Sequence, residues 1–189
     1  IRLVESNFVQ RGLQQSFAAL DGQPLPDAPR RLLELNFVNT STVVAKRQLL
    51  LALGGFNTQL RYGEDLELWL RIAARHPIAC LASVQEVRVE HDSNVTRSIE
   101  PMLQGYVKMA EVIREWAGAE MAQWGVDANR YVANCMADLG YWYFSNDRMA
   151  DARKAMLESF RESPNSKSII YFAGSLLPGA LRRFVRRFK

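Results

Sequence analysis

The residues most suited to chemistry are two adjacent acids, Glu64 and Asp65, at the start of a predicted helix over 64–75. On such a helix, one face consists of a carboxylate and three apolar residues: Asp65, Leu68, Trp69 and Ile72. Asp65 is therefore expected to face the core or the wall of a groove. A carboxylate within hydrogen-bond reach of a hydroxyl can take up its proton as a general base. The alternative is that both acids only complement the helix dipole.

The opposite stripe of this helix is predicted to be solvated and charged: Glu64, Glu67, Arg71 and Arg75. Glu67 and Arg71 are spaced i,i+4, which allows an ion pair on the helix surface. Upstream, Gly54-Gly55 is expected to end a short helix over 46–53, because glycines adopt the left-handed cap. The sequence predicts an extended stretch around 37–44.

Two strands are predicted after the acidic helix, Ile78–Leu81 and Val84–His91. The helix is expected to stop at His76-Pro77, because the residue before a proline disfavours helical geometry. Val87, Val89 and His91 alternate on one face of the second strand, so His91 is expected to point inward at its end. An inward histidine is either a satisfied structural residue or a metal ligand.

Five short motifs stand in one order along the chain: the stretch from Asn36 to Thr42, Lys46-Arg47, the Gly-Gly-Phe-Asn turn at 54–57, Glu64-Asp65 with Trp69 and Arg71 downstream, and Arg88 to Asn94. In this order the sequence resembles the family 2 glycosyltransferases, whose catalytic domain has the GT-A fold. The resemblance covers about residues 32–97. It predicts an α/β fold for 1–98, as the C-terminal, acceptor-side part of a GT-A domain, followed by an all-α region over 99–189.

The resemblance implies an inverting, non-processive transferase that moves a sugar from a nucleotide-sugar donor to a saccharide or lipid-linked acceptor. It makes Asp65 the catalytic base, supported by Glu64, and His91 a candidate metal ligand. The residues expected to bind substrate are Asn39, Gly63 and Trp69, with a core role as the alternative for Trp69. Those expected to support the acidic turn structurally are Arg71, Gly54 and Gly55.

Two motifs of such enzymes are absent from the sequence, Asp-X-Asp and the Gln-X-X-Arg-Trp of processive synthases. Because the chain begins at Ile1, we expect an upstream half that binds the donor and supplies most of the ligands of a divalent cation, Mg²⁺ or Mn²⁺. The chain alone is then expected to be inactive. A glycoside hydrolase is disfavoured, because its two carboxyl groups lie about 5 Å or more apart across the bond. Adjacent Glu64 and Asp65 diverge by about 100° around a helix.

The second half predicts helices over 101–118, 127–145 and 148–162, with a further helix at the end of the chain, after 177–179. Five residues fall at offsets that resemble one tetratricopeptide repeat: Leu139, Gly140, Tyr143, Ala152 and Pro164. A plain helical hairpin is the alternative. The competing function is a non-catalytic scaffold that binds a partner protein through helices 127–162.

The net charge of +4 comes from the last residues, Leu181–Lys189, where arginines face one side of an amphipathic segment. The rest of the chain is nearly neutral, which argues against a nucleic-acid-binding surface. The tail suits either an interfacial helix on anionic lipid or a solvated terminus. Cys80 and Cys135 have no ligand-like spacing and are expected to be reduced thiols. These features predict a cytoplasmic protein with a peripheral contact at the inner face of the membrane.

Overall fold

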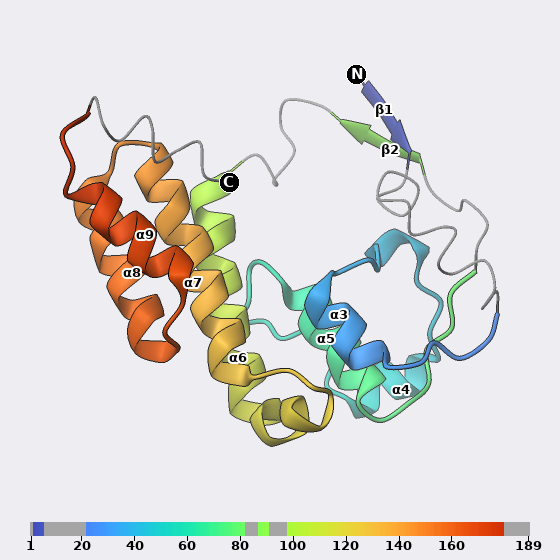
Figure 1. Cartoon of the computed structure of the whole chain (residues 1–189). Helices are drawn as coiled ribbons and strands as arrows, with labels where there is room; N and C mark the ends of the chain where they lie inside the picture. The colour runs from blue at the N-terminus through green and yellow to red at the C-terminus, as the bar shows by residue number, and fades with distance from the viewer. Residues whose placement is uncertain (1, 6–21, 82–86, 91–97, 180–189) are drawn as a thin grey trace. The chain divides into compact units, whose positions relative to one another are not determined.

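The computed structural model describes residues 2–5, 22–81, 87–90 and 98–179. Two compact units make up the chain, Ile1–Arg97 and Ser98–Lys189, which we call the first unit and the helical unit (Figure 1). Within the described ranges, no helix has both the length and the apolar character needed to span a bilayer.

Among its described residues, the first unit contains short helices and one pair of strands. Strand β1 (Arg2–Glu5) pairs antiparallel with β2 (Val87–Glu90), with Leu3 opposite Val89. The helices are α3 (Ala28–Glu34), α4 (Arg47–Ala52) and α5 (Glu64–Ala73), with a 3₁₀ turn, η1, at Thr40–Thr42. Helix α3 packs on α5 (Figure 1). Both helices contain buried leucines: Leu32, Leu33, Leu66, Leu68 and Leu70.

The predicted α/β fold, with 1–98 as part of a GT-A domain, is wrong. In the described part of the first unit, strand pairing is limited to the β1–β2 ribbon and one isolated antiparallel bridge, Pro24 with Ala79. Beside that bridge, Leu25 N donates to the Ile78 carbonyl at 2.8 Å and Gly22 N donates to the Cys80 carbonyl at 3.0 Å. A layered α/β domain needs parallel strands covered by helices, and the described residues do not form them.

The predicted extended stretch over 37–44 is interrupted by the η1 turn. The backbone N–H and the hydroxyl of Thr42 both donate to the Asn39 carbonyl, at 2.9 and 2.8 Å. Serine and threonine side chains bond to nearby backbone in this way and compete with strand ladders. The local turn therefore replaces the strand that the β-branched residues favoured.

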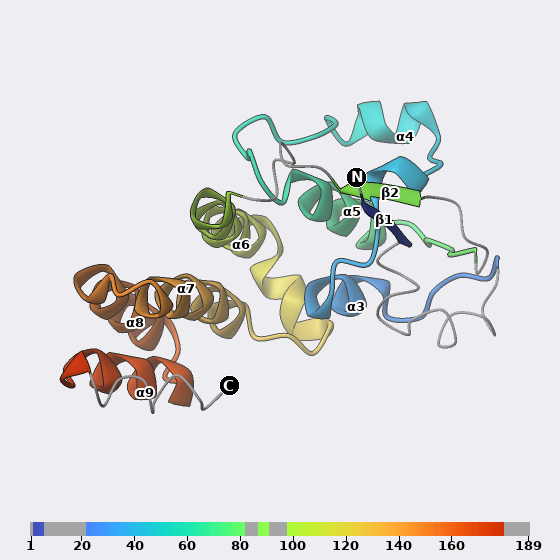
Figure 2. The same ribbon diagram turned by 90° about the horizontal axis from the view of Figure 1, so that it is seen from above.

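The helical unit consists, among described residues, of α6 (Ile99–Gln123), α7 (Ala128–Ser145), α8 (Met149–Glu162) and α9 (Ser166–Ser175). Helix α7 contacts α6 and α8, and α9 packs on α8 and α7 (Figure 2). The core is filled by side chains from all four helices: Met109, Ile113, Met121, Val132, Phe144, Met156 and Tyr171.

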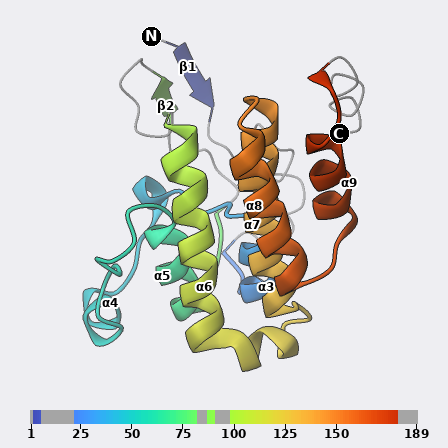
Figure 3. The ribbon, with the colours of Figure 1, turned by 90° about the vertical axis from the view of Figure 1, so that its left-hand side faces the viewer.

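Helices α7 and α8 form an antiparallel hairpin joined at 146–148, which confirms the two predicted helices (Figure 3). A Cβ added to Gly140 would lie 3.0 Å from the Met156 methyl carbon, so a larger residue at position 140 would require the Met156 side chain to shift. Helix α7 begins at Asp127, whose carboxylate accepts from Arg130 N at 2.9 Å. Such caps satisfy the free N–H groups of a first turn.

Helix α9 was not predicted. The Asn165 side chain caps it by accepting from Ser168 N at 2.8 Å, and the Asn165 amide also donates to Ser159 Oγ at 3.1 Å. Ser159, which is fully buried, donates its hydroxyl to the Ala133 carbonyl at 2.7 Å. This polar cluster joins α7, α8 and α9. The helix predicted for the end of the chain lies almost entirely outside the described residues.

Candidate functional site

The acidic helix α5 begins where Gly63 adopts a left-handed conformation, with φ 78°. Glycine occupies this region without the steric penalty that a Cβ brings. The Gly63 carbonyl accepts from Glu67 N at 3.0 Å and so starts the helix. Glu64 and Asp65 thereby lie in its first turn, both half-buried, above the buried Leu68 and Trp69.

Both carboxylate oxygens of Asp65 accept hydrogen bonds. Oδ2 accepts from the Asn36 side-chain amide at 3.3 Å, and Oδ1 accepts from Leu66 N at 2.7 Å. Asn36 comes from the segment after α3, so the contact links two elements that are far apart in sequence. The orientation of the carboxylate is therefore fixed at two points.

Asn36, and not the asparagine predicted for substrate binding, contacts Asp65 in the structure. Asn39 lies three residues further along, just before η1, where its carbonyl accepts from Thr42. The sequence marks Asn36 only as the first residue of the Asn36–Thr42 motif. Its contact with Asp65 could not be predicted, because it depends on how α3 packs on α5.

Two buried polar atoms of this region have no hydrogen-bond partner among the described residues, Asn36 Oδ1 and Trp69 Nε1. An unsatisfied buried group costs about 1–3 kcal/mol, so such groups are rare in folded proteins. The Trp69 ring packs edge-on against Phe56, with ring centroids 6.0 Å apart, and the side chain is 6% exposed. These contacts favour a core role for Trp69.

Arg71 connects α5 to the Gly-Gly turn. Its Nε and Nη2 donate to the two oxygens of Glu67, at 2.8 and 2.7 Å. Its Nη2 also donates to the Gly55 carbonyl at 2.7 Å, and Nη1 donates to the Leu53 carbonyl. The predicted i,i+4 pair forms, but Glu67 is only 2% exposed, so the predicted solvated stripe is wrong at this position. Burial is possible because Arg71 satisfies the carboxylate and two carbonyls together.

Gly54 and Gly55 both have positive φ, 79° and 68°. Gly54 N donates to Leu51 O at 3.0 Å and Gly55 N donates to Leu50 O at 2.9 Å. This pair of bonds is the Schellman motif that ends many helices, and it confirms the predicted left-handed cap of α4. The cap leaves the Leu53 and Gly55 carbonyls for Arg71.

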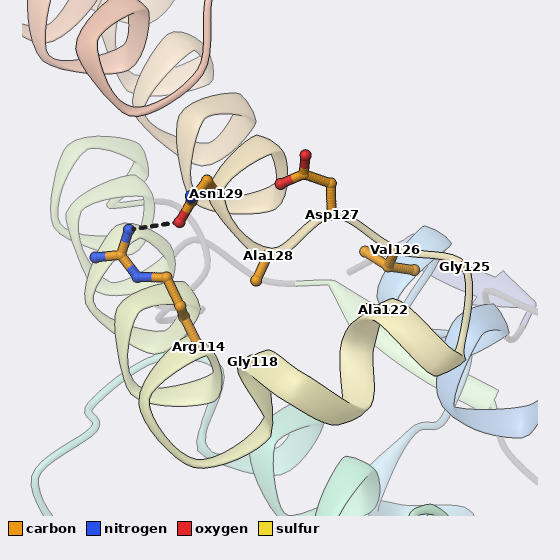
Figure 4. Close-up of a pocket in the computed structure, with 8 residues that line it drawn as sticks. All are labelled: Arg114, Gly118, Ala122, Gly125, Val126, Asp127, Ala128 and Asn129. Carbon is orange, nitrogen blue, oxygen red and sulfur yellow. Dashed lines mark hydrogen bonds between the residues drawn. The ribbon is translucent and has the colours of Figure 1, made fainter.

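His91 lies outside the described residues, as does the basic tail over 181–189. Across the ranges that the structure describes, no three or more His, Cys, Asp or Glu side chains gather as a metal site would require. A groove of about 570 Å³ occupies the α6–α7 turn, and Asp65 is not among its lining residues. Its floor is formed by small residues, including Gly118, Ala122 and Ala128 (Figure 4).

Comparisons with protein-family models, with curated proteins and with solved structures gave no match for this chain. Function must therefore be argued from the residues themselves. The acidic turn around Asp65 joins three polar groups: the half-buried Asp65 carboxylate, the half-buried Asn36 amide and the Arg71 guanidinium, which fixes helix α5 to the Gly-Gly turn.

Proposed function

We propose that this chain supplies the general base and the acceptor side of an inverting, non-processive glycosyltransferase. The proposal concerns the chemistry of the acidic turn and does not depend on the GT-A fold. The observation that supports it is the Asp65 carboxylate, half-buried at the head of α5 and held at both oxygens by N–H donors. A carboxylate fixed in this way can act as the general base that takes the proton of the acceptor hydroxyl during its attack.

The reaction is a one-step displacement at the anomeric carbon of a nucleotide sugar. The acceptor hydroxyl forms the new C–O bond, the bond to the nucleoside diphosphate breaks, and Asp65 receives the hydroxyl proton. Each Asp65 oxygen accepts one protein hydrogen bond, and a carboxylate oxygen has acceptor capacity beyond one bond. The remaining capacity is available to the acceptor hydroxyl.

The other residues of the acidic turn hold this base in place. Gly63 sets the start of α5, and Arg71 fixes the helix to the turn at Gly54-Gly55. The proposal assigns the nucleotide sugar, and most of the ligands of a Mg²⁺ or Mn²⁺ ion, to residues outside this chain, with His91 as a candidate ligand within it. The acceptor is a saccharide, free or lipid-linked.

The test uses the full-length natural protein and a panel of nucleotide sugars, with release of nucleoside diphosphate as the readout. Asp65→Asn should lower kcat by about 10²- to 10⁴-fold, the usual contribution of a general base. Binding of the nucleotide sugar should be unchanged. The control is Asp138→Asn, the same change at an exposed carboxylate on α7 that pairs with Lys167.

Normal turnover by Asp65→Asn would exclude Asp65 as the base. If the wild-type protein releases no nucleoside diphosphate from any nucleotide sugar, the transferase proposal fails as a whole.

A second candidate function, a scaffold for a partner protein, is supported by the surface of α8 and α9. Several large apolar side chains there are 39–64% exposed: Leu157, Phe160, Ile169, Ile170 and Leu176. Contiguous exposed apolar surface often marks a protein-binding site. Under this alternative, Phe160→Glu abolishes partner binding in a pulldown while Asp65→Asn leaves it intact. The control is Glu158→Lys, an exposed charge change on the same helix.

A further inference from the structure

The Asn36 side chain reaches Asp65 from outside the acidic helix. We propose that Asn36 is a positioning residue for the catalytic base, and that it orients the carboxylate without contacting the substrate. The inference rests on the proposed function of Asp65. Its evidence is the 3.3 Å hydrogen bond from Asn36 Nδ2 to Asp65 Oδ2, together with the lack of a partner for Asn36 Oδ1 among the residues that the structure describes.

The carboxylate decides which way the Asn36 amide points. An ionised carboxylate only accepts hydrogen bonds, so the NH₂ group must face it and the carbonyl oxygen must face away. In that orientation Asn36 Oδ1 is buried without a partner among the described residues. An asparagine retained for packing or stability would be expected to have both ends bonded. The amide therefore serves Asp65 while its own acceptor stays unsatisfied.

Two donors at two oxygens restrict rotation of the carboxylate. Leu66 N holds Oδ1 at 2.7 Å, and Asn36 holds Oδ2. Without Asn36, only the adjacent backbone N–H remains, and the plane of the carboxylate can turn about that single contact. Misplacement of a catalytic group by about 1 Å can lower the rate about 10²-fold.

Two variants separate positioning from a structural role. Asn36→Leu removes both polar ends at nearly the same shape, and Asn36→Asp keeps the shape but replaces the donor by a second carboxylate. In the full-length protein both should lower kcat by about 10²-fold, with little change in KM because Asn36 contacts the base. The Tm of Asn36→Leu should be unchanged or higher, because the unpaired buried acceptor is gone. The control is Asn134→Asp, an exposed asparagine on α7.

A second measurement does not depend on turnover. In the spectrum of the ¹⁵N-labelled protein, the side-chain amide signal of Asn36 is identified by its loss in Asn36→Leu. Asp65→Asn should shift that signal, and Asp138→Asn should leave it in place.

Each contrary result overturns the proposal in a distinct way. If the Asn36 amide signal has the same position in Asp65→Asn as in the wild type, the hydrogen bond between Asn36 and Asp65 is not formed. Unchanged kcat in both Asn36 variants shows that orientation is unimportant. A lower Tm in Asn36→Leu, with kcat restored on cooling, assigns a structural role. Absence of nucleoside diphosphate release by the wild type refutes the proposed function and the catalytic role of Asn36, even where the amide shift confirms the contact.

Discussion

The buried ion pair between Arg71 and Glu67 gives the most direct test of how the acidic helix is held. The change is Arg71→Met, which keeps a long apolar side chain but removes the guanidinium. The Glu67 carboxylate, whose side chain is 3% exposed, would lose its partner, and the Leu53 and Gly55 carbonyls would lose their donor. The variant should therefore be strongly destabilised.

The magnitude follows from burial. Removal of one partner from a buried ion pair costs about 3–5 kcal/mol, because the other charge is left uncompensated. Since the Arg71 side chain is 16% exposed, water can reach part of the site, and we expect the lower end, about 3 kcal/mol. A loss of 3 kcal/mol corresponds to about a hundredfold change in the unfolding equilibrium constant.

The assay uses Trp69, the only tryptophan within residues 1–97. With Trp116, Trp124 and Trp142 replaced by phenylalanine, fluorescence reports on the first unit alone. Urea unfolding of this protein with and without Arg71→Met then gives the difference in free energy, provided that the slope of the transition is unchanged.

Two further variants make the reasoning refutable. Arg30→Met removes the same kind of Arg–Glu pair at i,i+4 spacing, but on the exposed face of α3, and it should change the unfolding midpoint little. The double variant Arg71→Met, Glu67→Met leaves no unpaired charge, so it should be more stable than Arg71→Met alone. If Arg71→Met lowers the free energy of unfolding no more than Arg30→Met does, the Arg71–Glu67 pair is solvated and does not hold the acidic helix in place.

Three other predictions concern the helical unit. Burial, with a smaller contribution from Asp138, raises the pKa of the Cys135 thiol from 9.0 to about 12. Because the unfolded thiol ionises at lower pH than the folded one, the free energy of unfolding should fall as pH rises above 9.0. Urea titrations at several pH values should show this fall, and it should be smaller in Cys135→Ala. Gly118→Ala should raise the free energy of unfolding by up to about 1 kcal/mol, since the added Cβ would lie 3.8 Å from its nearest neighbour, Cγ of Arg114. Gly140→Ala should not show this gain in thermal unfolding, because its Cβ would crowd the Met156 side chain. Ser159→Ala should cost about 1–3 kcal/mol in the same assay, because it removes the buried hydroxyl that bonds the Ala133 carbonyl, Ser168 and Asn165 together.

The helices were predictable where local chemistry sets their ends. Helix α8 ends at Glu162, two residues before Pro164, and α7 begins after the cap at Asp127. The two glycines after α4 have the positive φ values expected of them. These features depend on neighbours within one turn, so a single sequence contains the information.

Strand β2 (Val87–Glu90) lies within the strand predicted over 84–91, but its pairing with β1 was not predictable, because a strand depends on a partner that the sequence does not name. Ala79 lies in a segment predicted as a strand, and it forms a single bridge to Pro24. Strand preference mostly reflects packing against neighbouring strands, so β-branched residues alone do not specify a sheet. The burial of Glu67 was missed for a related reason: it depends on Leu53 and Gly55, which approach Arg71 only in the folded chain.

Around the acidic turn lie two different polar side chains, the buried Glu67 and the half-buried Asn36, and they should respond to substitution in opposite ways. Glu67 is fully paired, so Glu67→Leu leaves the Arg71 guanidinium without its carboxylate and should lower the Tm. The buried Asn36 Oδ1 has no partner within the described part of the chain, so Asn36→Leu should leave the Tm unchanged or raise it. A polar group whose removal does not destabilise the fold is retained for another reason, and its contact with Asp65 identifies that reason as orientation of the carboxylate. If both leucine variants lower the Tm equally, Asn36 is a structural residue like Glu67, and the distinction between the two fails.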